Sequence, residues 1–182
     1  LLLTDEDAER IGALAKCSPA IRPREAVEAL WAELQAGRIP ILACDHSPAL
    51  PELKQGEDAF AWWGGISGLQ TLRGTLLAVA EERGLTLPQV AGLTAGSAAE
   101  RFALPRKGRL EVGRDADVVL VDLAHEGTVE QPDLRYRHPQ SPFVGMATRG
   151  RVVRTLARGK TVIEDGRLVA DAGFGRIVRP ER

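Results

Sequence analysis

The sequence predicts an α/β fold over residues 1–106, followed by a smaller all-β unit over residues 107–182. Three observations support this prediction. First, helix-type and strand-type apolar patterns alternate up to about Leu104, which is the order of elements in an α/β barrel. Second, Ile39–Cys44 is a continuous apolar run that stops at Asp45, as expected of a parallel strand buried on both faces. Third, short strand-like segments and tight-turn dipeptides fill the remainder, which is typical of antiparallel sheets.

Five helices are expected before residue 106, on two kinds of signal. One signal is a capping box, and the other is an apolar residue at every third or fourth position. Pro23 suits a first helical turn and Gly37 suits a helix end, so together they bound the second helix. The helices are expected at Thr4–Leu14, Pro23–Gly37 and Leu69–Gly84, and at two capping boxes, Thr86 with Gln89 and Ser97 with Glu100.

Strands are expected in the second part of the chain wherever branched aliphatic residues gather between turn residues. Two tight turns, Gly159-Lys160 and Asp165-Gly166, separate the later segments. The expected strands are Asp117–Asp122, Val152–Leu156 and Thr161–Ile163.

Composition excludes several classes of function. With 44% hydrophobic and 27% charged residues, the chain is globular rather than disordered. Its net charge of -1 provides no basic field for nucleic acid or an anionic membrane, and no apolar run is long enough to span a bilayer. Cys17 and Cys44 lack metal-site spacing, which indicates reduced thiols and a cytoplasmic setting. The chain begins at Leu1 and its only methionine is Met146, which indicates a processed or truncated polypeptide.

Asp45 is the first candidate catalytic residue. A carboxylate at the carboxyl end of a barrel strand lies where α/β barrels collect their catalytic groups. Asp, Ser and Pro are also ordinary turn residues, so Asp45–Pro48 alone is compatible with a plain turn. The neighbouring stretches decide between these two interpretations.

Several of these stretches resemble one enzyme family. The chain resembles the C-terminal portion of a cyclic amidohydrolase, and within that family the allantoinase group. The resemblance implies that residues 1–106 are the C-terminal part of a metal-dependent-hydrolase TIM barrel, and that residues 107–182 are part of a small β-sandwich. The stretches that carry it are Leu14–Pro19, Cys44–Pro48, Pro51–Lys54, Trp63–Gln70, Lys107–Asp117, Ser141–Gly145 and Arg158–Val162.

The resemblance implies hydrolysis of a cyclic amide at a centre of two divalent metal ions, zinc in the first place. The expected reaction of the full-length enzyme is the hydrolysis of allantoin to allantoate. Its expected binding partner is a small-molecule ureide. The enzyme is expected to form a homo-oligomer, namely a tetramer. Asp45 matches the family's aspartate, which serves as metal ligand and as proton shuttle. The other ligands are missing, because the only histidines are His46, His125 and His138. This chain alone is therefore expected to be inactive and to bind no metal stably.

The resemblance also implies substrate contacts at Ser18, His46, Gly64 and Gly65. Glycine lets the backbone approach a flat ring closely, and backbone N–H and C=O groups can pair with a ureide. Each residue has a simpler interpretation as well. Ser18 can be a turn hydroxyl, His46 can make local hydrogen bonds, and Gly64-Gly65 can be the turn that leads into a helix.

Two other functions stay open. One is a hydantoinase, dihydropyrimidinase or dihydroorotase type of hydrolase, which the Trp63–Gln70 stretch disfavours. The other is a non-catalytic module that has lost its metal ligands. A buried Asp45 would argue against such a module, because a lone buried carboxylate is costly unless it is paired or metal-bound. If barrel neighbours are missing, apolar side chains should be left short of partners, namely Leu30, Trp31, Leu72 and Leu76.

Overall fold

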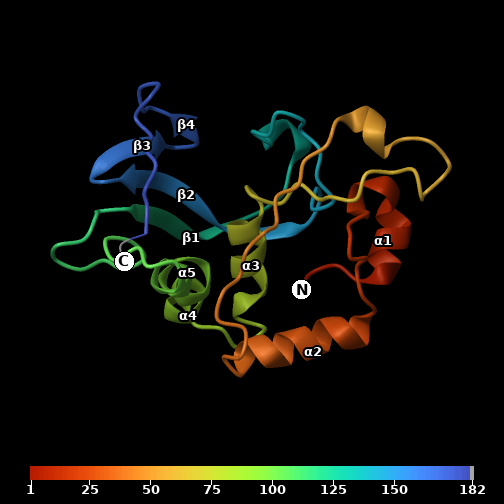
Figure 1. The fold of residues 1–182 in the computed structure, drawn as a ribbon, viewed down its shortest axis with the longest axis horizontal. Helices are drawn as coiled ribbons and strands as arrows, with labels where there is room; N and C mark the ends of the chain where they lie inside the picture. The colour runs from red at the N-terminus through yellow and green to blue at the C-terminus, as the bar shows by residue number, and fades with distance from the viewer. Residues whose placement is uncertain (181–182) are drawn as a thin grey trace. The chain divides into compact units, whose positions relative to one another are not determined.

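All helical elements except the short η4 precede the strands along the chain in the computed structural model, which describes residues 1–180 (Figure 1). This mixed α/β order confirms the predicted fold class. The helical elements are α1 (Asp5–Ile11), η1 (Gly12–Ala15), α2 (Arg24–Gln35), η2 (Pro51–Lys54), α3 (Leu72–Ala80), α4 (Leu87–Ala91), η3 (Gly92–Gly96), α5 (Ser97–Arg101) and η4 (Gln131–Asp133). The strands are β1 (Val118–Thr128), β2 (Ala147–Ala157), β3 (Lys160–Glu164) and β4 (Arg167–Leu168).

The chain divides into two units, each assembled from separated segments. The first unit comprises Leu1–Ile39, Ala43–Thr75 and Gly127–Thr148, and the second comprises Pro40–Leu42, Leu76–Glu126 and Arg149–Arg182. All five predicted site residues fall in the first unit. We describe each unit by itself.

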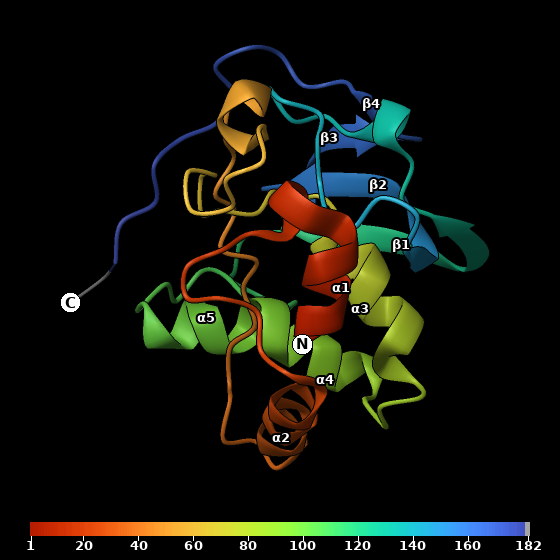
Figure 2. The same ribbon diagram turned by 90° about the vertical axis from the view of Figure 1, so that its right-hand side faces the viewer.

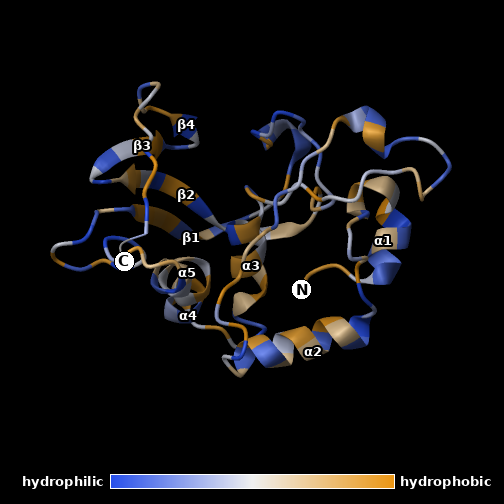
Figure 3. Ribbon diagram, in the orientation of Figure 1, coloured by the Kyte–Doolittle hydropathy of each residue, from blue (hydrophilic) through white to orange (hydrophobic). Residues whose placement is uncertain are grey.

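The first two helices of the first unit form as the sequence predicts. Thr4 and Asp7 make a reciprocal capping box, in which the Asp7 N–H donates to Thr4 Oγ1 at 3.3 Å and the Thr4 N–H donates to Asp7 Oδ2 at 3.0 Å. Helix α2 alternates apolar and polar residues (Figure 3) and buries Val27, Trp31 and Leu34. Because the capping and the periodicity are both local, sequence alone sufficed here.

The expectation that Leu30, Trp31, Leu72 and Leu76 lack partners is wrong for two of the four. Trp31 and Leu76 are each only 2% exposed. The Trp31 indole N–H also donates to the Leu1 carbonyl at 2.7 Å, so both its apolar and its polar parts are satisfied. Leu30 is 41% exposed, as expected of a side chain without a neighbour.

The helix predicted at Ser97 forms as α5, but the capping box predicted to open it does not. Thr86 and Gln89 form the expected capping box for α4, but the chain then continues through the π-type turn η3 directly into α5. Gly96, which precedes α5, keeps helical dihedrals, and Ser97 makes no side-chain cap. A capping box needs an extended residue at its first position, and the preceding turn never leaves the helical region.

The predicted strand Ile39–Cys44 is not a regular strand in the described residues. A strand exists through its ladder of hydrogen bonds, and this segment makes only scattered ones. The Leu42 N–H donates to the Leu93 carbonyl at 2.9 Å, and just beyond the segment His46 forms a parallel bridge with Ile66. The apolar pattern is therefore present without the neighbouring strands that would complete a ladder.

The strands lie in the order β1-β2-β3-β4 in one sheet (Figures 1 and 2). The later strands are joined by tight turns at Arg158-Gly159, one residue earlier than predicted, and at Asp165-Gly166, and both residues of each turn have positive φ. Positive φ at both positions characterises the type I′ turn, which matches the twist of a hairpin. The three predicted strands are confirmed, and the structure adds the short β4.

Gly150 marks a close approach inside the second unit. It lies in β2 with φ of +82°, and a Cβ placed on it would be 2.7 Å from Val121 Cγ1 and 3.2 Å from Leu77 Cδ1. Only glycine fits there, because a side chain would meet both a strand and a helix of the same unit.

Asp115 anchors the loop that precedes β1. Arg106 lies 2.7 Å from its carboxylate and Lys107 lies 3.0 Å away. The Arg106 guanidinium first, and the Lys107 ammonium second, hold the pKa of Asp115 down at about 2. The Asp117 carboxylate extends the network by accepting the Arg158 N–H at 2.7 Å.

Among the described residues, no helix is long and apolar enough to cross a membrane.

Candidate active site

Asp45 stands where the extended segment turns away into the next loop. Its φ is +43°, in the left-handed region that non-glycine residues seldom adopt, and its side chain is exposed. Asp tolerates this conformation better than most residues. The expectation of a buried Asp45 is therefore wrong for the described residues. The argument from burial against a non-catalytic module loses its support as well.

His46 is held by the backbone of the loop that follows Gly65. Its parallel bridge to Ile66 is joined by a hydrogen bond from the Ser47 N–H to the Ile66 carbonyl at 2.9 Å. The N–H groups of Gly68 and Leu69 point at His46 Nδ1, at 3.3 and 3.4 Å. A nitrogen that accepts N–H groups carries no proton, so the proton of the neutral ring is on Nε2. His46 can therefore offer one further donor, its Nε2–H.

Ser18 and Gly64, two of the predicted site residues, lie against each other. A Cβ placed on Gly64 would be 3.4 Å from Ser18 Cβ, which is ordinary contact. The adjacent Gly65 is packed far more tightly, because a Cβ there would be 2.6 Å from the Ser47 carbonyl oxygen. The Gly65 N–H already donates to the Lys16 carbonyl at 3.0 Å. Only its carbonyl remains for a ligand.

Lys54 supports the backbone around Lys16 through hydrogen bonds, and the sequence prediction missed this role. Its side chain is only 9% exposed, and Nζ donates to the carbonyls of Ala13 at 2.7 Å and Lys16 at 3.3 Å. Burial lowers the pKa of Lys54. The Lys16 carbonyl thus receives both Lys54 and Gly65, which ties three segments together.

Cys17 lies beside the same corner. Burial raises the pKa of its thiol, and the negative charge of Asp45 acts in the same direction, while Lys54 opposes it. The thiol donates to the Pro19 carbonyl at 3.1 Å. Cys17 is therefore a protonated packing residue, and its interaction with Asp45 indicates that the segment around Ser18 lies near the aspartate.

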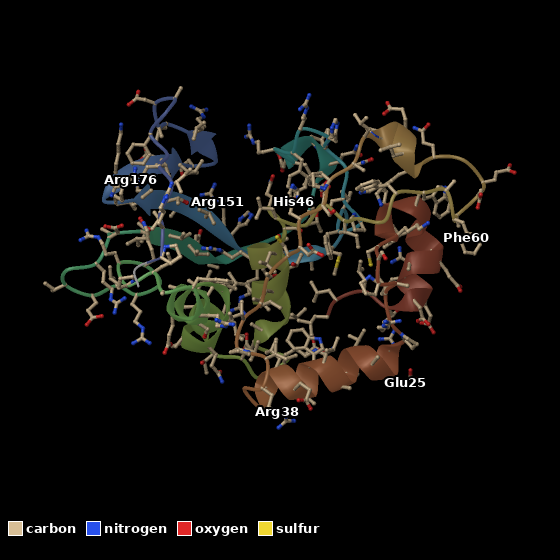
Figure 4. The ribbon with its side chains drawn as sticks, in the orientation of Figure 1. Glu25, Arg38, His46, Phe60, Arg151 and Arg176 are labelled. Atoms are coloured by element: carbon tan, nitrogen blue, oxygen red, sulfur yellow. The ribbon has the colours of Figure 1, made fainter. Side chains whose placement is uncertain are left out.

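The loop after Lys54 projects outward. Lys16 Nζ donates to the carbonyls of Ala59 and Phe60, the latter at 3.1 Å. Phe60 itself is 96% exposed and points away from the ribbon, whereas His46 lies among the other segments of its unit (Figure 4). Trp62 donates its indole N–H to the Gly56 carbonyl at 3.0 Å, which ties the end of this loop to its start.

The described residues do not bring together a metal centre. Within residues 1–180, no three side chains of His, Cys, Asp or Glu come together in a way that could hold a metal ion. His46 has its Nδ1 engaged by backbone amides, and Asp45 is the single candidate ligand of the site. One carboxylate does not fix a divalent ion against water, so we derive no catalytic step through a metal.

Comparison with known proteins identifies the family. The family model described as "Amidohydrolase family" matches residues 2–162. The chain belongs to the Amidohydrolase family. Allantoinase from Rubrobacter xylanophilus is 52% identical to this amidohydrolase chain over its whole length, and allantoinase from Solibacter usitatus is 42% identical. The chain spans 40% of the length of each of these relatives.

Solved structures agree on the fold. L-hydantoinase from Arthrobacter aurescens superposes with a TM-score of 0.90 at 35% identity, over 96% of this amidohydrolase chain and 40% of its own. D-hydantoinase from a Thermus species gives 0.91 at 30% identity, over 99% of this chain and 41% of its own. The predicted resemblance to cyclic amidohydrolases is thereby confirmed.

Proposed function

We propose that the complete protein containing this chain hydrolyses a cyclic amide, and that its substrate is allantoin, which it opens to allantoate. The observation that carries the proposal is the 52% identity, over every residue of this chain, to an allantoinase. The loops around Asp45 and around Gly64-Gly65 form one structural unit, which supports a shared role in binding one ring.

The residues have separate tasks in this proposal. A water oxygen adds to the ring carbonyl carbon, the bond from that carbon to the ring nitrogen breaks, and one proton moves from the water to the departing nitrogen. The exposed Asp45 carboxylate takes this proton and returns it. The ureide groups of the ring are held by Ser18, the Gly64 backbone, the Gly65 carbonyl and the Nε2–H of His46. Each of them offers a donor or an acceptor of the kind that a ureide requires.

The remaining parts of the proposal concern the whole protein. We place the division between a barrel portion and a β-sandwich portion near residue 106, with residues 107–182 forming the latter. Two zinc ions, a tetrameric assembly and a cytoplasmic location complete the expectation. The ligands that Asp45 lacks must come from outside the described residues, so the 182-residue chain alone should be inactive and should bind no metal stably.

A second candidate is a hydantoinase or dihydropyrimidinase type of activity, which the names of the superposed structures favour. The test is to assay the complete protein against allantoin, a dihydropyrimidine, a hydantoin and dihydroorotate under matched conditions. The proposal expects the highest kcat/KM for allantoin. A higher value for any other ring would replace the substrate, and no hydrolysis of any of them by the metal-loaded protein would favour a non-catalytic module.

A further inference from the structure

A segment that follows β1 is hydrogen-bonded to the loop beside the candidate site. The Gln70 side chain is bound at both ends, with Nε2 donating to the Asp133 carbonyl and Oε1 accepting the Arg135 N–H, each at 2.8 Å. The Gln70 backbone N–H donates to the Tyr136 hydroxyl, also at 2.8 Å. The amide plane of Gln70 therefore pairs with the 133–135 backbone as a neighbouring strand would. We call Gln70 with residues 133–136 the Gln70–Tyr136 clamp.

The clamp reaches His46 through an aromatic contact. The Tyr136 ring lies with its centroid 4.9 Å from that of His46, at an interplanar angle of 41°. Burial raises the pKa of Tyr136, so its oxygen stays a neutral hydroxyl that can accept and donate. On the other side, His46 Nδ1 receives the amides of Gly68 and Leu69. Tyr136 thus contacts the His46 ring and also the loop whose backbone N–H groups point at that ring.

A second attachment fixes the same loop. Ser141 Oγ donates to the Ser67 carbonyl at 2.6 Å, and both serines are buried. A Cβ placed on Gly68 would be 3.3 Å from the Phe143 ring, so that ring packs directly on the loop backbone. Residues 67–70 have no regular secondary structure of their own. Their conformation therefore depends on contacts made more than sixty residues further along the chain.

We propose that the Gln70–Tyr136 clamp holds the Gly64–Gln70 loop and the His46 ring in the arrangement that the reaction requires, with Gln70 and Tyr136 as positioning residues. The assignment of a reaction rests on the proposed function, whereas the grip on the loop does not. The clamp acts through His46 and the loop amides, and neither of its two residues needs to touch the substrate. Displacing reacting groups by about 1 Å can reduce a rate about 100-fold, so a loop held this way is a sensitive point.

Three single variants of the complete protein test the proposal. Tyr136→Phe keeps the ring beside His46 and removes the hydroxyl that accepts the backbone N–H of Gln70. Gln70→Ala removes both side-chain hydrogen bonds. Arg137→Ala is the matched control, because Arg137 is exposed on the same segment and is not part of the clamp.

The kinetic expectation separates positioning from binding. With allantoin, kcat should fall about tenfold for Tyr136→Phe and about 100-fold for Gln70→Ala, while KM changes less than threefold. The double variant should be no slower than Gln70→Ala alone, because both changes release one loop. Bound metal should equal that of the wild type. Wild-type kcat in both single variants, or fully additive losses in the double variant, would overturn the proposal.

Hydrogen exchange tests the clamp independently of the substrate. The backbone amides of Gly68, Leu69 and Gln70 should exchange faster in Tyr136→Phe and Gln70→Ala than in the wild type. Their exchange rates should be unchanged in Arg137→Ala. Unchanged exchange in the two clamp variants overturns the clamp, whatever the activity. If the wild type opens no allantoin but exchange accelerates as described, the clamp stands and the proposed substrate fails.

Discussion

Replacing Gly65 with alanine should destabilise the protein, and replacing the adjacent Gly64 should not. Neither glycine has a positive φ, so alanine can adopt the backbone conformation at both positions. What differs is the space. At Gly65 the new Cβ would be 2.6 Å from the Ser47 carbonyl oxygen, whereas at Gly64 its nearest neighbour would be Ser18 Cβ at 3.4 Å.

The size of the effect follows from what must move. The Cβ at position 65 would have to retreat by roughly 0.8 Å to reach ordinary contact with Ser47, and neither side can yield freely. Ser47 is bound through its N–H to the Ile66 carbonyl, and the Gly65 N–H is bound to the Lys16 carbonyl. Crowding of this kind costs about 1–3 kcal/mol, and losing one of the two hydrogen bonds adds about 1 kcal/mol. We expect a loss of about 2–4 kcal/mol.

The assay compares wild type, Gly65→Ala and Gly64→Ala in parallel denaturant titrations of the complete protein. Gly64→Ala should stay within about 0.5 kcal/mol of the wild type, since ordinary surface-loop changes do so. Equal stability of the two variants would refute the reasoning, because the neighbouring positions differ in the space around the added methyl group.

Three further predictions concern single side chains. Asp45→Asn in the complete protein should reduce kcat by about 1000-fold or more with the fold intact, because the proton carrier is lost; turnover near the wild-type rate would assign catalysis elsewhere. Lys54→Met should lower the free energy of unfolding by about 1–3 kcal/mol, since two half-buried carbonyls each lose the charged one of their two donors, and a thermal midpoint equal to the wild type would contradict this. Asp115 has a folded pKa of about 2 against an ordinary value of 3.8, so its stabilising effect is complete above about pH 4 and fades as the pH falls through this range. The difference in thermal midpoint between wild type and Asp115→Asn should therefore be larger at pH 7 than at pH 3, and a constant difference would count against the ion pairs.

Local signals in the sequence predicted local structure well. The capping boxes at Thr4 and Thr86 formed because each is a set of hydrogen bonds within four residues. The same pattern at Ser97 failed, because the preceding turn supplies helical backbone and leaves nothing to cap. The apolar run Ile39–Cys44 was recognised, but its ladder depends on neighbours that a pattern within one segment does not contain.

The candidate site divides in the same way. The family resemblance assigned Ser18 and Gly64 to one site, and the structure places them in contact. Gln70 and Tyr136 were missed, because their hydrogen bond joins positions 66 residues apart and no short motif encodes it. The one available hint was that Tyr136 is the only tyrosine in the chain. A single aromatic hydroxyl in an irregular, proline-containing loop has to be fixed by tertiary contacts.

Gly150 carries a lesson for any survey of sequence variation in this family. Its position is constrained by Val121 and Leu77, two aliphatic side chains with no part in the proposed reaction. Substitution there would separate a strand from the helix packed on it, so natural drift should avoid the position as strongly as it avoids a catalytic one. A ranking of positions by invariance would place this glycine beside Asp45. Only the steric environment tells the two kinds of constraint apart.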